Sequence, residues 1–364
     1  MAKQPFLPPP LPPELDVSSL VSVLVEAREV VGRYDEAIKR LHNPTIIRRT
    51  FETKEAVLSS RIEGTQATFE EVLEFDAGEI EAEENEKQRD YREITNYRQA
   101  IDHGRELLKE KPLDENVFKE LHRKLLNSVR GKNKSPGEFR THQVHIGPPG
   151  ATIEEASYIP PVHAEIPRLI SGLAKYIHRG DQPDRLIQAA LMHYQFEAIY
   201  PFADGNGRVG RLLIPLYLHD KGLTTHPNLF VSEFLEAHRR DYYERLNSVS
   251  EKDEWLEWIV FFLRAVREQS KLSKERVDKV ENLYKSLREQ LPGFNSKYAS
   301  SLLDAIFIHP TFTPISIAKK SGINNTQTLL NLIGKFAKAG LIRDLTPQRE
   351  RNKLYYLEPL MMVL

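Results

Sequence analysis

The residues best suited to chemistry lie in one short stretch, residues 200–211, which reads YPFADGNGRVGR. Its glycines, Gly205 and Gly207, can adopt backbone geometries that are closed to other residues, and the apolar run that follows predicts a helix beginning near Arg208. Backbone N–H groups at such a helix start, together with the helix dipole, bind anionic phosphates. Arg208 and Arg211 are three residues apart, so both can project from one helical face toward the same anion. The spacing therefore predicts a phosphate-binding loop.

Two further side chains in this stretch extend the prediction. Asp204 lies directly before the glycines, where its carboxylate can hold an Mg²⁺ ion that bridges phosphate oxygens. Asn206 adds a neutral hydrogen-bond donor, and Pro201 ends the preceding helix. A Gly-Asn-Gly sequence alone is a common turn, but an acid before it and two spaced arginines after it favour the phosphate site.

The stretch resembles the signature of the Fic family, H-x-F-x-[D/E]-G-N-G-R-x-x-R, and matches every defining position except the first. The family contains protein adenylyltransferases, which transfer AMP from ATP to a protein hydroxyl. The resemblance implies that Asp204 binds Mg²⁺ and that the loop from Gly205 to Gly207 surrounds the α- and β-phosphates. It also implies that Arg208 and Arg211 hold the terminal phosphates, so Mg²⁺ with ATP is the expected substrate.

Other segments resemble further parts of the same family. Residues 139–161 are similar to its flap, a β-hairpin that covers the nucleotide and holds a target segment by strand addition. The matching positions are Phe139, Arg140, Gln143, Ile146, Gly147, Ile159, Pro160 and Pro161. The resemblance places Ile146 and Gly147 against ATP, and it places Tyr242 and Tyr243 beside the adenine. A tyrosine pair on a helix also fits simple packing.

A second motif lies upstream, where Ser59 to Gly64 reads SSRIEG and fits the family's inhibitory pattern [S/T]-x-x-x-E-[G/N]. The resemblance implies that Glu63 pairs with Arg211 and blocks the γ-phosphate position, which makes the protein self-inhibited. Taken without the first motif, a glutamate and a glycine at this place indicate only a helix end, with Gly64 as its cap.

The departure from the family signature is Tyr200, which stands where the family has its catalytic histidine. That histidine takes the proton from the attacking hydroxyl, a role that needs a pKa near the working pH. A phenol with a pKa of about 10 is a poor base at neutral pH. His193, predicted to pack in the core, and His145, on the flap, are poor substitutes. We therefore expect impaired turnover with nucleotide binding largely intact.

Patterns along the chain predict a mainly α fold with several parts: a Fic helical core with a β-hairpin flap, an N-terminal helical layer and a C-terminal winged helix-turn-helix. The predicted boundaries are 1–110 for the N-terminal helical region, 113–267 for the core, 268–296 for a linker helix and 297–364 for the winged helix. The acid-rich sequence EIEAEENEKQRDYREI favours a solvated helix face or a loop leading into a helix over a binding site. Three helices and a hairpin at the C-terminus also fit a packing or dimerisation module.

Composition limits the function classes. The 364 residues carry 51 basic and 52 acidic side chains, a formal net charge of -1, so no global field attracts nucleic acid or an acidic membrane. The sequence has no Cys, which excludes disulfides and thiolate chemistry. Six prolines before Glu14 are unlike a secretion signal, and no apolar run has the length of a membrane span. We expect a cytoplasmic protein that does not contact a membrane.

Two functions remain open on these grounds. The first is a self-inhibited protein adenylyltransferase that modifies Tyr, Ser or Thr hydroxyls of an unidentified protein target or of itself, with catalysis impaired by Tyr200. The alternative is a catalytically silent ATP-binding regulator that acts through a DNA-binding winged helix, since residues 297–364 carry nine basic and four acidic side chains. Some members of the family transfer phosphocholine or phosphate instead, and a homodimer is open as well.

Overall fold

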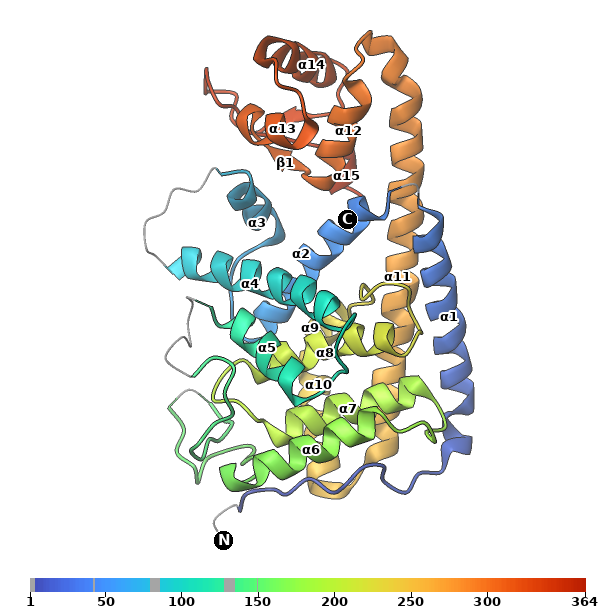
Figure 1. Ribbon diagram of the computed structural model, residues 1–364, viewed down its shortest axis with the longest axis vertical. Helices are drawn as coiled ribbons and strands as arrows, with labels where there is room; N and C mark the ends of the chain where they lie inside the picture. Colours follow the sequence, from blue (N-terminus) through green and yellow to red (C-terminus); the bar gives the residue numbers. More distant parts are fainter. Residues whose placement is uncertain (1–3, 42, 79–85, 128–134, 149) are drawn as a thin grey trace. The chain divides into compact units, whose positions relative to one another are not determined.

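The computed structural model describes residues 4–41, 43–78, 86–127, 135–148 and 150–364 (Figure 1). Helices make up most of these residues, and the strands among them form one small sheet, which confirms the predicted mainly α fold class. None of the described helices has both the length and the apolar composition that crossing a membrane requires.

The chain divides into two compact units. One unit consists of residues 1–35, 58–65 and 92–271, and the other consists of residues 36–57, 66–91 and 272–364. Of the predicted domain boundaries, the one between residues 267 and 268 falls inside a helix that continues without a break. Helix α4, Glu86–Leu107, and helix α11, Trp255–Gln290, each contribute residues to both units.

Two buried helices form the centre of the first unit. Helix α7, Arg185–Ile199, and helix α8, Asn206–Asp220, pack against each other and are apolar on nearly every face, as expected for helices inside a core. Amphipathic helices cover them: α6, Ile166–Ile177, packs on α7, and α5, Glu115–Leu125, packs on α8. The candidate site therefore rests on two helices whose positions are fixed by the core.

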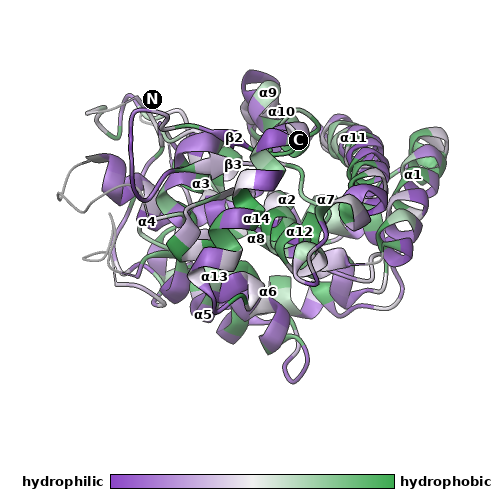
Figure 2. Ribbon diagram, turned by 90° about the horizontal axis from the view of Figure 1, so that it is seen from above, coloured by the Kyte–Doolittle hydropathy of each residue, from purple (hydrophilic) through white to green (hydrophobic). Residues whose placement is uncertain are grey.

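The remaining helices of this unit surround that centre. They are α1 (Val21–Arg40), α2 (Pro44–Ile62), α4, α9 (Ser232–Ala237), α10 (Arg239–Lys252) and α11, of which α1, α2, α4 and α11 continue into the other unit. Helix α1 is amphipathic, and Figure 2 shows hydrophilic and hydrophobic residues along it. Trp258 of α11 is fully buried and donates its indole N–H to the carbonyl of Ala190 at 2.9 Å.

The flap is less regular than predicted. In place of a β-hairpin, the described residues of 139–161 contain a single antiparallel bridge between Ile146 and Tyr158. Tyr158 donates its hydroxyl to the carbonyl of Ala198 on α7 at 2.7 Å, so the segment is anchored by a side chain. Glycine and prolines in this segment leave few consecutive residues for a ladder, which explains why the strands do not extend.

The second unit contains most of the C-terminal region. Its elements are α3 (Phe69–Asp76), α12 (Ala299–Ile308), β1 (Thr311–Phe312), α13 (Pro314–Ser321), α14 (Thr326–Lys338), β2 (Arg343–Asp344), β3 (Tyr355–Tyr356) and α15 (Glu358–Met361). The strands form an antiparallel sheet in the order β1-β3-β2, in which Thr311 and Arg343 both lie opposite Tyr356. The three predicted helices and two predicted strands are present, whereas β1 and α15 were not predicted.

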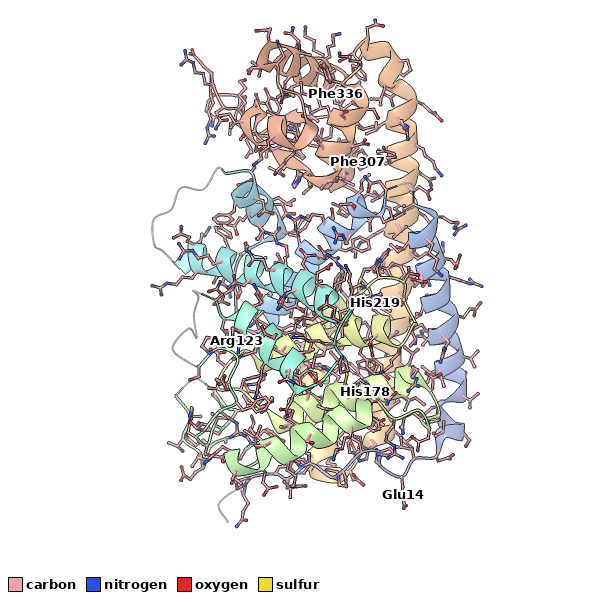
Figure 3. All side chains as sticks on the ribbon, viewed as in Figure 1. Glu14, Arg123, His178, His219, Phe307 and Phe336 are labelled. Carbon is pink, nitrogen blue, oxygen red and sulfur yellow. The ribbon has the colours of Figure 1, made fainter. Side chains whose placement is uncertain are left out.

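Local sequence signals explain how these helices begin and end. Thr313 and Ser316 form a reciprocal capping box at the start of α13, and Gly322 ends this helix with a left-handed φ of 70°. Asn325 caps α14 by accepting the backbone N–H of Thr328 at 2.8 Å. The core of the module includes the fully buried rings of Phe307 and Phe336, which are labelled in Figure 3.

Candidate functional site

The loop between α7 and α8 begins with an unusual backbone conformation at Tyr200. This residue has φ 50° and ψ 60°, and its N–H donates to the carbonyl of Phe196 at 3.1 Å, so it closes the last turn of α7. Gly205 is also left-handed, with φ 75°, and it immediately precedes the first residue of α8. Because a left-handed conformation is strained for residues other than glycine, the reversal at Tyr200 depends on the contacts around it.

Asn206 closes the same loop with its side-chain amide. Its Oδ1 accepts the backbone N–H of Phe202 at 2.8 Å, and its Nδ2 donates to the carbonyl of Phe202 at 2.9 Å. The predicted neutral donor is therefore bonded to the loop itself. Its structural effect is to hold the loop that leads into α8 in one shape.

His122 of α5 positions the residue before the glycines. The N–H of Gly137 donates to Nδ1 of His122 at 2.8 Å, so Nε2 carries the proton and donates to the carbonyl of Asp204 at 3.0 Å. The ring stacks on Phe202, with centroids 3.8 Å apart. Burial lowers the pKa of His122 to about 4, which keeps the ring neutral and its tautomer fixed at physiological pH.

The Asp204 carboxylate stands at the mouth of this loop. Its Oδ1 accepts the N–H of Gly205 at 2.6 Å and lies 3.7 Å from Nη2 of Arg208, and 36% of the side chain is exposed. Within the described ranges, no group of three or more His, Asp or Glu side chains could hold a metal. A single exposed carboxylate suits Mg²⁺, which typically takes one or two carboxylates together with substrate phosphates and water.

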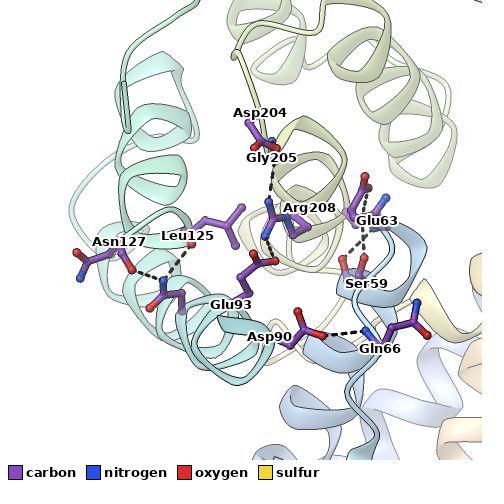
Figure 4. Close-up of polar contacts among 12 residues, drawn as sticks. Ser59, Glu63, Gln66, Asp90, Glu93, Leu125, Asn127, Asp204, Gly205 and Arg208 are labelled. Atoms are coloured by element: carbon purple, nitrogen blue, oxygen red, sulfur yellow. Dashed lines mark hydrogen bonds and ion pairs between the residues drawn. The ribbon is translucent and has the colours of Figure 1, made fainter. Parts of the chain in front are cut away.

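Arg208 is paired with a carboxylate that was not predicted. Its Nη1 donates to Glu93 of α4 at 2.9 Å, and the two side chains are only 5% and 6% exposed (Figure 4). The helix predicted in EIEAEENEKQRDYREI is present, but its buried side chains correct the prediction of a solvated face outside the binding site. Its residues from Glu86 on form the start of α4, and Gln88, Asp90 and Glu93 are buried; residues 79–85 lie outside the described part.

Arg211 is held by the upstream motif. Its Nε donates to the hydroxyl of Ser59 at 2.9 Å, and its Nη2 donates to the carbonyl of Ser59 at 2.9 Å and to Glu63 at 2.6 Å. Gly64 follows in a left-handed conformation, with φ 102°, which turns the chain away just after α2. The residues expected to inhibit thus lie against the second arginine of the loop.

Electrostatics keep this pair ionised. Partial burial opposes ionisation of Glu63, but the charge and hydrogen bond of Arg211, helped by Arg208 and Arg239, hold its pKa below the usual value. Glu63 also lies close to the loop backbone, since a Cβ at Gly207 would collide with its carboxylate. Glycine at position 207 therefore leaves room for an anionic group beside Arg211.

A cavity of about 450 Å³ adjoins these groups. It brings together eight of the predicted site residues: Glu63, Ile146, Gly147, Tyr200, Gly207, Arg211, Tyr242 and Tyr243. Other predicted residues do not line it, namely Ser59, Gly64, Asp204, Gly205, Asn206 and Arg208. Of these residues, Asp204 stands at the mouth of the loop, and the others lie behind the residues that line the cavity.

The two tyrosines of α10 differ in their surroundings. Tyr242 is buried and donates its hydroxyl to Nε2 of His193 at 2.9 Å, while Nδ1 of His193 donates to the carbonyl of Gly210 at 3.2 Å. Tyr243 is 39% exposed and presents its ring to the cavity. His193 is fully buried, as predicted, and its hydrogen bonds leave it no basic nitrogen for chemistry in the cavity.

Tyr200 is poorly suited to accept a proton. Burial raises the pKa of its phenol above the usual value, and the charges of Glu63 and Glu197 raise it further. Its carbonyl accepts the Nε–H of Arg140 at 2.9 Å, and the same guanidinium donates to the carbonyl of Pro161 at 2.6 Å. Arg140 therefore ties the flap to the backbone of the loop.

Several residues of this site were missed or assigned no role from the sequence. Glu93 and Glu197 are single glutamates within helices, and no spacing distinguishes them from surface charges. His122 sits on the apolar face of a strongly amphipathic helix, which was the available signal for a buried histidine. Arg239 lines the cavity, and it is an exposed arginine in a run of polar residues.

Comparisons with known sequence families match both halves of this site. A profile described as Fic/DOC family N-terminal matches residues 21–106, and a profile described as Fic/DOC family matches residues 112–218. Together they cover more than half of the chain. The first match contains Ser59 and Glu63, and the second contains the loop with Arg208 and Arg211.

Individual curated relatives match a shorter part of the chain than the family profiles do. Protein adenylyltransferase Fic of Culex quinquefasciatus is 32% identical over 138 residues, which are 37% of this chain and 24% of that relative. The match thus spans about a quarter of the length of the curated relatives.

Solved structures share the fold. A Fic family protein from Desulfovibrio desulfuricans aligns with a TM-score of 0.62 at 22% identity, over 95% of this chain and 98% of that one. A Fic domain containing signaling protein from Bacteroides thetaiotaomicron aligns with a TM-score of 0.56 at 19% identity, over 70% of this chain and 97% of that one.

Proposed function

The chain belongs to the Fic/DOC family, and we propose that it is a self-inhibited protein adenylyltransferase, which transfers AMP from ATP to a protein hydroxyl. The observation that carries the proposal is the cavity in which Gly207, Arg211 and the flap residue Gly147 meet. Its volume of about 450 Å³ lies within the range of nucleotide-sized pockets. The activity named for the curated relatives supports the same assignment.

The phosphates would bind at the start of α8. Backbone N–H groups of the first turn, from Asn206 on, point out of the helix, and its dipole favours an anion there. Arg211 supplies a charged donor inside the cavity, and Arg208 lies one turn before it on the same helix. The ring of Tyr243, on the other side of the cavity, would contact the adenine.

Asp204 would hold Mg²⁺, because it is the exposed carboxylate at the loop mouth and His122 fixes its backbone. When bound, the ion supplies positive charge that neutralises the phosphate oxygens. Arg208 would share the same phosphate region, since it already lies 3.7 Å from Oδ1 of Asp204.

Glu63 would act as the brake. Its carboxylate accepts a hydrogen bond from the Arg211 guanidinium, which the terminal phosphate would need. Its lowered pKa keeps it anionic at neutral pH. A γ-phosphate entering this position meets both an occupied donor and a like charge. Full activity therefore requires Glu63 to leave Arg211.

The reaction joins the acceptor hydroxyl oxygen to the α-phosphorus of ATP and breaks the bond from that phosphorus to the bridging oxygen. Pyrophosphate leaves with the bonding electrons, and the hydroxyl proton must pass to a base. The acceptor would come from a protein segment laid along the flap, or from an exposed Tyr, Ser or Thr of the chain itself. Tyr200 does not supply an effective base, so transfer is expected to be slow.

Transfer of label from ATP carrying a radioactive α-phosphate tests the proposal. Tyr200→His should raise AMP transfer over the Glu63→Gly chain when both changes are combined, because an imidazole is a base of matched pKa. Self-labelling is the readout, with a cell lysate as a second acceptor. A double variant that binds Mg²⁺-ATP in calorimetry but labels neither itself nor the lysate contradicts the proposal.

A second candidate function is ATP binding coupled to DNA recognition. The observation that favours it is the exposed polar side of α14, where Gln327 and Asn331 are hydrogen-bonded at 2.9 Å and Lys338 ends the helix. A second helix with an exposed polar face, followed by a β-hairpin, is an arrangement that enters the major groove in winged proteins. Under this reading the site binds ATP without transferring AMP.

A further inference from the structure

The last turns of α7 carry three titratable side chains on one face. His193, Glu197 and Tyr200 are spaced by four and three residues, so they follow one face of the helix. His193 is committed to two hydrogen bonds, and Tyr200 has the left-handed backbone that ends the helix. Glu197 stands between them and lines the same cavity as Tyr200 and Arg211.

Room for the Glu197 carboxyl is provided by a glycine of α8. A Cβ at position 210 would collide with Oε1 of Glu197, so Gly210 is the residue that allows the close approach. Oε1 is shielded from solvent and has no hydrogen-bond partner in the described part of the chain. A buried polar atom without a partner is costly, which suggests a role beyond packing.

The two carboxylates that line the cavity therefore differ. Glu63 is held by Arg211 at 2.6 Å, whereas Glu197 has an oxygen to which nothing donates. Rotation about the last side-chain torsion exchanges the two carboxyl oxygens of Glu197 at little cost, so either oxygen can turn to the cavity. Only the second carboxylate is available to accept a proton from a molecule in the cavity.

The charged and titratable groups around Glu197 are Arg211 on α8, Glu63 after α2, Tyr200 in the loop, and the tyrosines of α10. Burial raises the pKa of Glu197 to about 8; Arg211 lowers it and Glu63 raises it. The charge of Glu197 in turn contributes to raising the pKa of Tyr242 and of Tyr243. A general base works best when its pKa lies near the working pH.

We propose that Glu197 is the general base for AMP transfer in this chain, in place of the unsuitable phenol of Tyr200. The inference rests on the proposed function. The Glu197 carboxylate accepts the hydroxyl proton of the acceptor as that oxygen attacks the α-phosphorus. The bond from α-phosphorus to the bridging oxygen breaks, and pyrophosphate leaves with the electron pair.

The test compares four chains, all carrying Glu63→Gly: the parent, Glu197→Gln, Tyr200→His and the combination of the last two. Self-labelling from α-labelled ATP is measured, with calorimetry of ATP binding as the check on folding. Glu197→Gln should lower transfer by ~10²–10⁴ in the parent. The same change should lower it far less beside Tyr200→His, because the imidazole then supplies the base.

A pH profile gives a second readout. Transfer by the parent should rise with an apparent pKa below about 8, because Glu63→Gly removes a negative charge that raises the pKa of Glu197. Glu197→Gln should abolish this rise. Glu257→Gln, at an exposed glutamate paired with Arg245 on the surface, is the matched control and should leave rate and profile unchanged.

The outcomes separate the two proposals. Equal losses from Glu197→Gln in both backgrounds mean that the residue is structural, and this overturns the inference. Transfer by the Tyr200→His chain with none by the parent also overturns it, while the adenylyltransferase proposal stands. If none of the chains transfers AMP despite binding ATP, both proposals are wrong.

Discussion

Each of the two arginines of the loop has a carboxylate of its own. Arg208 pairs with Glu93 from α4 and Arg211 pairs with Glu63 after α2. The pairs differ in burial, since Glu93 is 6% exposed and Glu63 is 37% exposed. A buried partner holds its arginine in one position and leaves its other N–H groups for a ligand, whereas a half-exposed partner can itself be exchanged for a phosphate.

Arg208→Ala should weaken Mg²⁺-ATP binding by about 10- to 100-fold, because a charge-assisted hydrogen bond is worth ~1.5–3 kcal/mol. Calorimetry measures the affinity. The variant also leaves Glu93 buried and unpaired, so its melting temperature should fall. Arg208→Ala combined with Glu93→Leu should recover stability but not affinity. An unchanged affinity in either variant would contradict the assignment of this loop.

Glu63→Gly should raise the affinity for ATP, since it frees Arg211 and removes a carboxylate that repels the γ-phosphate. ADP, which lacks that phosphate, is the control ligand and should gain much less. The comparison by calorimetry isolates the terminal phosphate. Equal affinities of the parent and the variant for ATP would mean that Ser59 to Gly64 is only a helix end.

At the scale of elements, the sequence predicted helices best where local residues fix the position at which a helix begins or ends. The helix starting near Arg208 and the C-terminal helices were predicted within a few residues, because glycines, prolines and capping residues mark their ends. The partner of Arg208 was not predictable. Pairing of Glu93 with an arginine 115 residues away depends on how α4 and α8 pack, and no local pattern encodes that.

The flap shows a different limit. Short runs such as Gln143 to Ile146 have β-type composition, but the described residues form one bridge. Side-chain anchors at Arg140 and Tyr158 hold the segment instead of a ladder. Composition predicts strand propensity, whereas long-range hydrogen bonds decide whether a strand forms.

Helix α7 also makes the protein sensitive to acid through His193. Burial lowers the pKa of His193 to about 3, so the unfolded chain, with a pKa of about 6.5, binds the proton more strongly. Stability should therefore be lost as the pH falls from about 6.5 toward 3. His193→Gln should show a smaller decrease in melting temperature between pH 7 and pH 4. Equal slopes for the two proteins would contradict the assignment.

At the scale of the whole molecule, the C-terminal module is the part whose role the proposed chemistry leaves open. Its basic side chains include Lys338 on α14 and Arg351 in the hairpin loop 345–354, whereas Lys353 of the same loop is paired with Asp344 at 2.7 Å. The chain as a whole has a net charge of -1, so attraction to a polyanion would have to be local.

If this module binds DNA, the affinity of the full-length chain for a duplex should fall as salt rises. Arg351→Ala should reduce the slope of log affinity against log salt by about 1, the value expected for one phosphate contact. Fluorescence anisotropy of a labelled duplex measures both quantities. Lys285→Ala, on α11, is the control and should leave the slope unchanged. Binding that is absent, or insensitive to salt, removes the regulator candidate.

The left-handed turn at Tyr200 has a genetic consequence. The backbone at this position is set by the end of α7, by Pro201 and by Arg140, and both tyrosine and histidine lack the conformational freedom that glycine has there. Histidine and tyrosine codons differ by one base. A single point mutation can therefore exchange the two residues while the fold and the nucleotide site persist, so a lineage can lose this base and regain it without rebuilding the protein.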